Sequence, residues 1–212
     1  MSRVRRHCRA LRHAGLICAL LATGACSTVP DEPALLQTRE QIEKRQALQQ
    51  WRLNARLGVQ SATEGGSLDM FWTQRGERYQ IRLVAPLGQG ALLLEGDASQ
   101  VSARLASGER LQGEPGQLLQ QHFGVAVPVA SLRYWLRGLP APDTPLQNVE
   151  RNAAQQLQRF TQHGWKVELR DYRKIADVML PHRFYLEPLD AASAADGGDT
   201  SVRLLVQQWV LN

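Results

Sequence analysis

The sequence predicts a mainly β domain with a helical lid, in which an antiparallel sheet curves into an unclosed barrel around a hydrophobic cavity. Three observations lead to this prediction. Apolar and polar residues alternate in short segments along most of the chain, as in strands that bury one face. Gly, Pro, Asp and Ser bound these segments, as expected for antiparallel turns. Two helical patterns interrupt the strands, and helices placed there can plug the open sheet.

The first 25 residues have the three parts of a secretory signal peptide. Five arginines precede an apolar run, Ala14 to Ala22, which is too short to span a bilayer as a stable helix, and small residues follow. Removing this segment takes away five of the 25 basic residues and none of the 20 acidic ones. The mature chain then has a formal net charge of zero, which leaves no electrostatic argument for binding nucleic acid.

Cys26 would be the first residue of the mature chain. Cys8 and Cys18 lie in the removed segment, so no internal disulfide can form. A single N-terminal cysteine in an exported chain makes sense if acylation consumes the thiol. Residues 23–26, Thr-Gly-Ala-Cys, resemble a bacterial lipobox, with Thr23 where Leu is usual. We therefore expect a lipidated N-terminus and tether over residues 26–33 and one folded domain over residues 34–212. Ser27, where Asp would favour the inner membrane, favours the outer membrane.

A helix is predicted from Ala34 to about Arg52, with a thin apolar stripe that includes Leu48 and Trp51. The period then changes from the helical one to two. The strands predicted in this half of the domain cover residues 53–60, 68–72, 79–85, 91–95, 101–105 and 110–112.

Two short helices are predicted in the middle of the chain. One opens at Glu114-Pro115-Gly116 and runs through Phe123, and the other runs from Val129 to Arg137 and stops at Gly138. A proline-marked loop follows. Strands are then predicted at residues 157–161, 165–170, 184–186 and 202–211, which gives roughly ten strands in all.

A turn within an apolar stretch, Pro86-Leu87-Gly88, places a leucine where polar residues are usual. Proline at the second and glycine at the fourth position favour a type I turn, which would hold Leu87 outward. Burial of one leucine in lipid is worth about 1.5 to 3 kcal/mol, which is enough to bias contact but too little to anchor a protein. The alternative is that Leu87 folds back against the lid helices.

Large apolar side chains on the strands and helices are candidates to line the cavity. Each of them could equally belong to an ordinary core. The candidates for contact with an acyl chain are Trp51, Leu57, Met70, Trp72, Ile81, Leu83, Trp135 and Trp165.

No catalytic or metal-binding pattern is present in the sequence. His122, His163 and His182 lack metal-ligand spacing, and there is no nucleophile elbow, P-loop or dinucleotide fingerprint. We therefore expect no enzyme, no metal and no cofactor. A hydrolase would need a pocket with converging titratable groups, which sequence alone does not reveal.

Four stretches, in this order and spacing, resemble the LolB family of outer-membrane lipoprotein receptors. They are "FWTQRGERYQIRL" and "RLVAPLGQGALLL", which overlap across residues 71–94, "VPVASLRYWLRGLP" at residues 127–140 and "QQWVLN" at the end. The resemblance implies an unclosed β-barrel of the LolA/LolB type with a cavity for the acyl chains of lipoprotein cargo. It also implies a membrane-touching leucine in the loop, which maps onto Leu87.

The resemblance implies the partners as well. They are the periplasmic carrier LolA, acylated lipoproteins, and the outer membrane, where a lipid-anchored monomer would face the periplasm without using a cofactor or ATP. The exposed arginines Arg56, Arg78 and Arg82 are candidates to meet an acidic rim on the carrier. The competing interpretation is a structural or assembly lipoprotein that binds a protein partner through its sheet.

Overall fold

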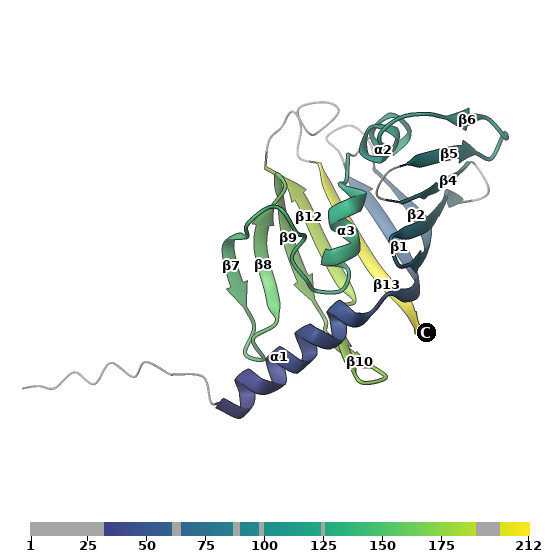
Figure 1. The fold of residues 1–212 in the computed structure, drawn as a ribbon. Helices are drawn as coiled ribbons and strands as arrows, with labels where there is room; N and C mark the ends of the chain where they lie inside the picture. The colour runs from purple at the N-terminus through teal and green to yellow at the C-terminus, as the bar shows by residue number, and fades with distance from the viewer. Residues whose placement is uncertain (1–31, 61–64, 87–89, 98–99, 124–125, 190–199) are drawn as a thin grey trace, which may run out of the picture. The chain divides into compact units, whose positions relative to one another are not determined.

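The computed structural model of the chain describes residues 32–60, 65–86, 90–97, 100–123, 126–189 and 200–212. Within these ranges there are three helices and thirteen strands (Figure 1). The helices are α1 (Glu32–Ala47), α2 (Pro115–Phe123) and α3 (Val129–Trp135). The strands are β1 (Gln50–Gln60), β2 (Gly65–Arg75), β3 (Arg78–Val84), β4 (Ala91–Gly96), β5 (Val101–Leu105), β6 (Arg110–Leu111), β7 (Gln147–Arg151), β8 (Leu157–Gln162), β9 (Trp165–Arg170), β10 (Arg173–Ile175), β11 (Val178–Leu180), β12 (Arg183–Pro188) and β13 (Ser201–Leu211).

Eleven of the strands form one antiparallel sheet that does not close. Their order is β6-β5-β4-β3-β2-β1-β13-β12-β9-β8-β7, while β10 and β11 form a separate hairpin. The chain that connects the two edge strands, β6 and β7, carries α2 and α3. In Figure 1, α3 lies over the part of the sheet formed by β1, β13 and β12. The predicted mainly β fold with an unclosed sheet and helices is confirmed.

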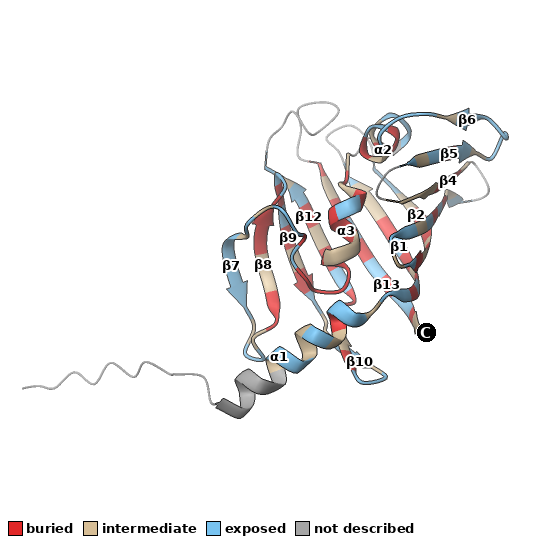
Figure 2. Ribbon diagram, in the orientation of Figure 1, coloured by how far each residue is buried: buried red, intermediate tan, exposed pale blue. Residues whose placement is uncertain are grey.

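The period-two pattern buries one face of the sheet, as β1 illustrates. Trp51, Leu53 and Ala55 are almost fully buried, whereas Arg52 and Arg56 between and beside them are exposed. Because successive side chains of a strand point to opposite faces, the same alternation in the neighbouring strands builds one continuous apolar face. Figure 2 shows this face as red segments on the strands beneath α3.

Strands β1 and β13, the first and the last in the sequence, pair with each other near the middle of the sheet. Their register runs from Trp51 opposite Leu211 to Gln60 opposite Ser201, with a bulge at Asn54 and Ala55. On its other side β1 pairs with β2 along its whole length. Strand β1 therefore joins β2 to β6, which follow it in the sequence, to β13 and the strands beyond it, which come from the second half of the chain.

The predicted first helix is too long at its C-terminal end. Helix α1 ends at Ala47, and Trp51 belongs to β1 instead. The Trp51 ring packs against Trp72 and Trp209, at centroid distances of 5.6 and 5.3 Å. Strand pairing on both sides and burial of this ring outweigh the helical spacing that Trp51 shares with Leu48.

Three strands were not predicted. All five residues of β7 are exposed, so its sequence shows no alternation. Strands β10 and β11 have three residues each, which is too short for a period to be visible. The described strands consequently exceed the roughly ten that the pattern predicts.

The predicted bounds of α2 agree with the structure, whereas α3 ends at Trp135, two residues before the predicted Arg137. At the start of α2, the Glu114 carboxylate accepts hydrogen bonds from the main-chain N–H groups of Gly116 and Gln117, at 2.7 and 3.2 Å. After α3 the chain reverses at Gly138, whose φ is +69°. A Cβ atom at Gly138 would lie 2.8 Å from Arg45 Nη1 and 2.9 Å from the Tyr172 hydroxyl, so glycine is needed here for space as well as for conformation.

Candidate functional site

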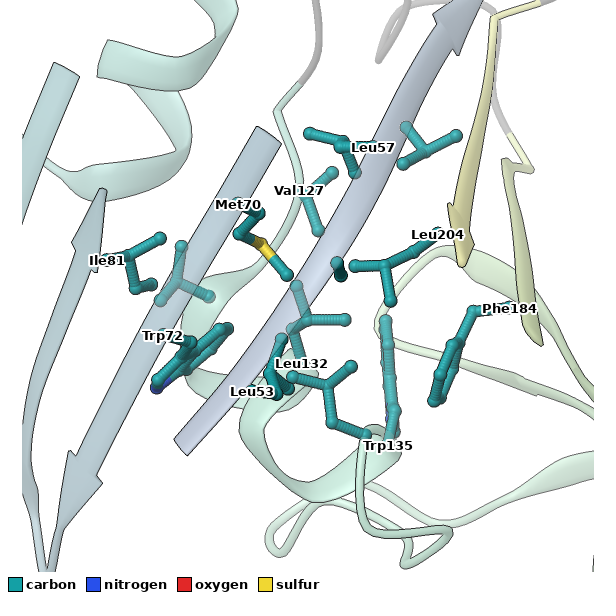
Figure 3. Packing of buried hydrophobic residues seen from close by; sticks show 14 of the residues in the cluster. Leu53, Leu57, Met70, Trp72, Ile81, Val127, Leu132, Trp135, Phe184 and Leu204 are labelled. Atoms are coloured by element: carbon teal, nitrogen blue, oxygen red, sulfur yellow. The ribbon is translucent and has the colours of Figure 1, made fainter. Parts of the chain in front are cut away.

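A small apolar cavity lies between the sheet and the helices. Its volume is about 30 Å³, and its walls come from β1 to β4, β12, β13, α2, α3 and the segment before α3. Figure 3 shows part of this packing, with Met70 and Ile81 on the strands and Leu132 on the helix side. The lining residues are Leu57, Met70, Trp72, Ile81, Leu83, Leu94, Leu119, Val127, Val129, Leu132, Leu186, Val202 and Leu204.

Five of the eight cavity candidates line this space. They are Leu57, Met70, Trp72, Ile81 and Leu83. The three other candidates lie in the core outside the cavity wall. Trp51 packs with Trp72 and Trp209, Trp135 lies 6.2 Å from Phe160, and Trp165 is buried on β9. Which of the eight side chains contact a ligand stays a prediction.

The lid side of the cavity was not predicted residue by residue. Leu119 on α2, Val127 before α3, and Val129 and Leu132 on α3 all line the cavity. The apolar residues of the run from 127 to 132 gave a signal, but only the fold places them opposite the strands. The only nitrogen-bearing lining side chain, Trp72, donates its indole N–H to Gln74 Oε1 at 2.8 Å, so its polar group is satisfied.

Two buried side chains hold the C-terminal end of α3 by hydrogen bonds. Trp135 on α3 donates its indole N–H to Gln162 Oε1 on β8, at 2.8 Å. The same amide oxygen accepts from the N–H of Ala141, and the Gln162 amide nitrogen donates to the carbonyls of Ala141 and Thr144. Gln162 is 2% exposed, so loss of these bonds would leave several buried polar groups unpaired.

A second attachment of the same end is made by two buried arginines. Arg45 near the end of α1 donates from Nη1 to the carbonyl of Gly138, at 3.2 Å. Arg137 donates from Nη1 to the carbonyls of Arg45 and Leu48, at 3.1 and 3.0 Å. We call this pair the arginine clasp. Burial lowers the pKa of both guanidinium groups because their charged forms lose hydration.

A wider groove, partly polar and about 390 Å³ in volume, lies at the C-terminal end of α1. Leu48, Trp51, Glu77, Arg133 and Tyr134 are among its lining residues. Arg133 donates to Glu77 at 2.7 Å and to the Tyr134 hydroxyl at 2.8 Å, which closes one side of the groove with an ion pair. This groove therefore differs in character from the wholly apolar cavity.

The predicted lipidation site and most of the predicted membrane loop lie outside the described residues. This applies to Cys26, Leu87 and Gly88. Pro86, the last described residue before the gap, is exposed at the end of the segment that follows β3. The roles of these four residues stay predictions.

Two further observations concern the described part of the chain. No group of three or more His, Cys, Asp or Glu side chains in it is arranged to hold a metal ion. None of its helices combines the length and the apolar character needed to cross a membrane.

Solved structures share this fold at low sequence identity. A LolA superfamily protein from Nitrosomonas europaea superposes with a TM-score of 0.55 at 10% identity, over 84% of this chain and 93% of that one. A DUF1329 family protein from Desulfovibrio piger gives a TM-score of 0.52 at 9% identity, over 84% and 91% of the two chains. These similarities support the architecture described above.

Sequence relatives are considerably more similar. The "Outer-membrane lipoprotein LolB" of Alkalilimnicola ehrlichii is 37% identical, over 91% of this chain and 94% of its own length. The protein of the same name from Pseudomonas fluorescens is 32% identical over 97% and 96% of the two chains. The family model described as outer membrane lipoprotein LolB matches residues 49–209, from just before β1 to near the end of β13. The chain therefore belongs to the LolB family of outer-membrane lipoproteins.

Proposed function

We propose that this protein is an outer-membrane lipoprotein receptor, which accepts acylated lipoproteins from the periplasmic carrier LolA and inserts them into the outer membrane. The observation that carries this proposal is the apolar cavity on the buried face of an unclosed sheet, in a chain of the LolB family. A cavity walled by apolar side chains favours a hydrocarbon ligand, because its walls have no polar groups that need a hydrogen-bond partner from the ligand.

The cavity has to enlarge before it can hold an acyl chain. Its volume of about 30 Å³ is room for only about two or three water molecules, at ~10–15 Å³ for each. The C-terminal end of α3 is fixed by Trp135 and by the arginine clasp, whereas Val129 and Leu132 meet the strands through apolar contacts alone. Apolar contacts are non-directional, and a hydrocarbon ligand can replace them. The N-terminal part of α3 is accordingly the part that moves away from the sheet when cargo enters.

Transfer follows increasing affinity for the acyl chains. The cargo passes from the carrier's cavity to this cavity and then to the bilayer, which buries the chains most completely. No nucleotide is consumed in this passive sequence. An absolute requirement for ATP in the step from carrier to receptor would refute it.

Lipid on Cys26 holds the receptor at the outer membrane, with the folded domain in the periplasm. Several acyl chains give a firm anchor, at about 0.8 kcal/mol per buried methylene. Leu87 is then free to serve delivery, by contacting the bilayer at the tip of the loop that begins after β3. A monomer suffices for this work, because one chain carries the cavity, the anchor and the loop.

The alternative of an assembly lipoprotein that binds a protein through its sheet is not favoured. Such a protein needs an exposed strand edge or groove but no apolar interior space. The cavity and the LolB family membership both favour binding of acyl chains.

Cargo transfer to the mature chain with Cys26→Ala tests the proposal. This form starts at residue 26, keeps every described residue and lacks the acyl anchor. LolA loaded with an acylated lipoprotein is mixed with it, and transfer and subsequent release into liposomes are measured. Leu87→Glu is compared with Leu189→Glu, a matched control because Leu189 is 54% exposed and directly follows the last residue of β12.

We expect all forms to accept acylated cargo and to reject the unacylated lipoprotein. Leu87→Glu should then fail to deliver to liposomes, while Leu189→Glu delivers like the parent. If no form accepts acylated cargo, the receptor function is wrong. If both glutamate variants deliver normally, the receptor function stands and the role of Leu87 is refuted.

A further inference from the structure

Three arginines and two apolar residues form a single row across the outer face of the sheet. Arg110 on β6 pairs with Arg104 on β5, Arg104 with Leu93 on β4, Leu93 with Arg82 on β3, and Arg82 with Phe71 on β2. We call these five residues the arginine band. Their sequence neighbours Ile81, Leu92, Leu94 and Ala103 are buried on the opposite face, so the band faces away from the cavity.

None of the three arginines of the band forms an ion pair within the described part of the chain. Arg82, Arg104 and Arg110 are all exposed. Two acidic side chains on neighbouring rows of this face contact other groups. Asp69 on β2 is paired with Val84, two residues after Arg82, and its Oδ1 lies 3.5 Å from Arg56 Nη1. Glu95, on the other side of the band, accepts a hydrogen bond from Gln80 at 2.6 Å.

The geometry of Arg82 suits an anion that approaches from solvent. Its guanidinium carbon lies 4.4 Å from the centre of the Phe71 ring, which holds the planar group flat on the sheet. A guanidinium fixed in this way keeps N–H donors free for the oxygens of a phosphate, which it can bind in bidentate fashion. Neighbouring strands are about 4.8 Å apart, so Arg82 and Arg104 lie about 10 Å apart and Arg110 about 5 Å further on.

We propose that the arginine band binds the phosphate groups of anionic phospholipids and thereby lays this edge of the sheet on the membrane surface. The half-buried Leu93 lies between Arg82 and Arg104, and the half-buried Phe71 lies beside Arg82, which matches a surface that mixes charge with hydrocarbon. On β3, Arg82 is followed two residues later by Val84, the last residue of the strand, and four residues later by the exposed Pro86. The band therefore lies close to the segment that follows β3.

A lipid surface fits the band better than an acidic carrier does. The carrier has to reach the cavity, whereas the band lies on the other face of the same strands. This argument rests on the proposed function, since the N-terminal lipid is what keeps the domain beside a bilayer. At an anionic membrane surface, each arginine increases the partitioning of the protein from water onto the membrane about fivefold.

Vesicle binding without any cargo tests the band. The mature chain with Cys26→Ala is mixed with vesicles of phosphatidylcholine alone or of phosphatidylcholine with phosphatidylglycerol, at low and at high salt, and bound protein is measured by sedimentation. The test variant is Arg82→Gln/Arg104→Gln/Arg110→Gln. The control, Arg52→Gln/Arg75→Gln/Arg203→Gln, removes three exposed arginines that lie outside the band. Circular dichroism and thermal unfolding verify the fold of both.

We expect binding to phosphatidylglycerol vesicles that weakens at high salt, falls more than tenfold in the band variant and changes less than threefold in the control. Equal binding to both vesicle types, or equal losses in the two triple variants, would overturn the proposal. A band variant that still binds vesicles but no longer receives cargo from LolA would instead identify a protein-docking surface. Band-dependent vesicle binding by a chain that accepts no acylated cargo would leave the band intact while refuting the receptor function.

Discussion

Arg45 and Arg137 bind the ends of each other's helices. The Arg137 guanidinium donates to the main-chain carbonyl of Arg45, and the Arg45 guanidinium donates to the carbonyl of Gly138, which follows Arg137. The two side chains are 2% and 8% exposed, and the carbonyls at these helix ends have lost their helical partners. The clasp thus satisfies the carbonyl of Arg45 in the last turn of α1 and that of Leu48 just after it, and it fixes α3 beside them.

Loss of the Arg137 side chain should destabilise the fold strongly. We expect Arg137→Ala to lower the free energy of unfolding by about 2 to 4 kcal/mol, because it leaves one buried and one partly buried carbonyl without donors. Urea unfolding of the mature chain measures this change. Arg39→Ala on the exposed side of α1 is the control and should change stability by less than about 0.5 kcal/mol. Equal effects of the two substitutions would contradict the role of the clasp.

Leu132→Ala should weaken the fold and yet improve binding of an alkyl probe. Removing this side chain enlarges the cavity and costs about 2 to 5 kcal/mol of stability. The added space reduces the movement of α3 that a bound chain requires. Leu169→Ala provides the control, since Leu169 is 1% exposed on β9 but does not line the cavity. A fluorescent fatty acid should bind more tightly to the first variant only, and an equal gain in both would show that loosening of the core suffices.

Stability should decrease as the pH falls below neutrality because of His182. Burial lowers the pKa of this imidazole from its usual 6.5, and its Nδ1 lies 3.0 Å from the carbonyl oxygen of Leu180. The unfolded chain therefore binds the proton more tightly than the folded one. The stabilisation is complete above 6.5 and is lost as the pH drops from there towards the folded pKa. In His182→Gln, the slope of unfolding free energy between about pH 7 and 5 should shrink. An unchanged slope would assign the pH dependence to other groups.

Ala176→Gly should stabilise the β10–β11 hairpin. Ala176 is exposed and has a φ of +52°, a conformation that penalises a side chain with a Cβ. Glycine relieves that strain but gains more freedom in the unfolded chain, so we expect a net gain of about 0.5 to 1 kcal/mol. Ala153→Gly, in an exposed turn without a positive φ, should give no gain. Thermal unfolding distinguishes the two variants.

Periodicity was sufficient to predict the sheet where one face of a strand is buried. Strands such as β1 and β9 alternate cleanly between buried and exposed residues. The pattern failed at β7, which exposes every side chain, and at Trp51, whose helical spacing from Leu48 is accidental. Both elements are determined by pairing with distant strands, and such pairing leaves no local trace in the sequence.

The strand wall of the cavity was easier to predict than its other parts. Met70, Trp72 and Ile81 belong to alternating strands, so their common face follows from the period. The lid residues come from a helix and a linker whose position over the sheet is decided by tertiary packing. The clasp could not be predicted, because its arginines bind carbonyls 89 to 93 residues away in the sequence.

The pairing of the first strand with the last also affects how the protein can be made. Until β13 is available, β1 to β6 and β7 to β12 have no strand between them, and β1 lacks one of its two partners. The eleven residues of β13 are therefore the last that the sheet needs, and its two parts can be joined only once this strand is present.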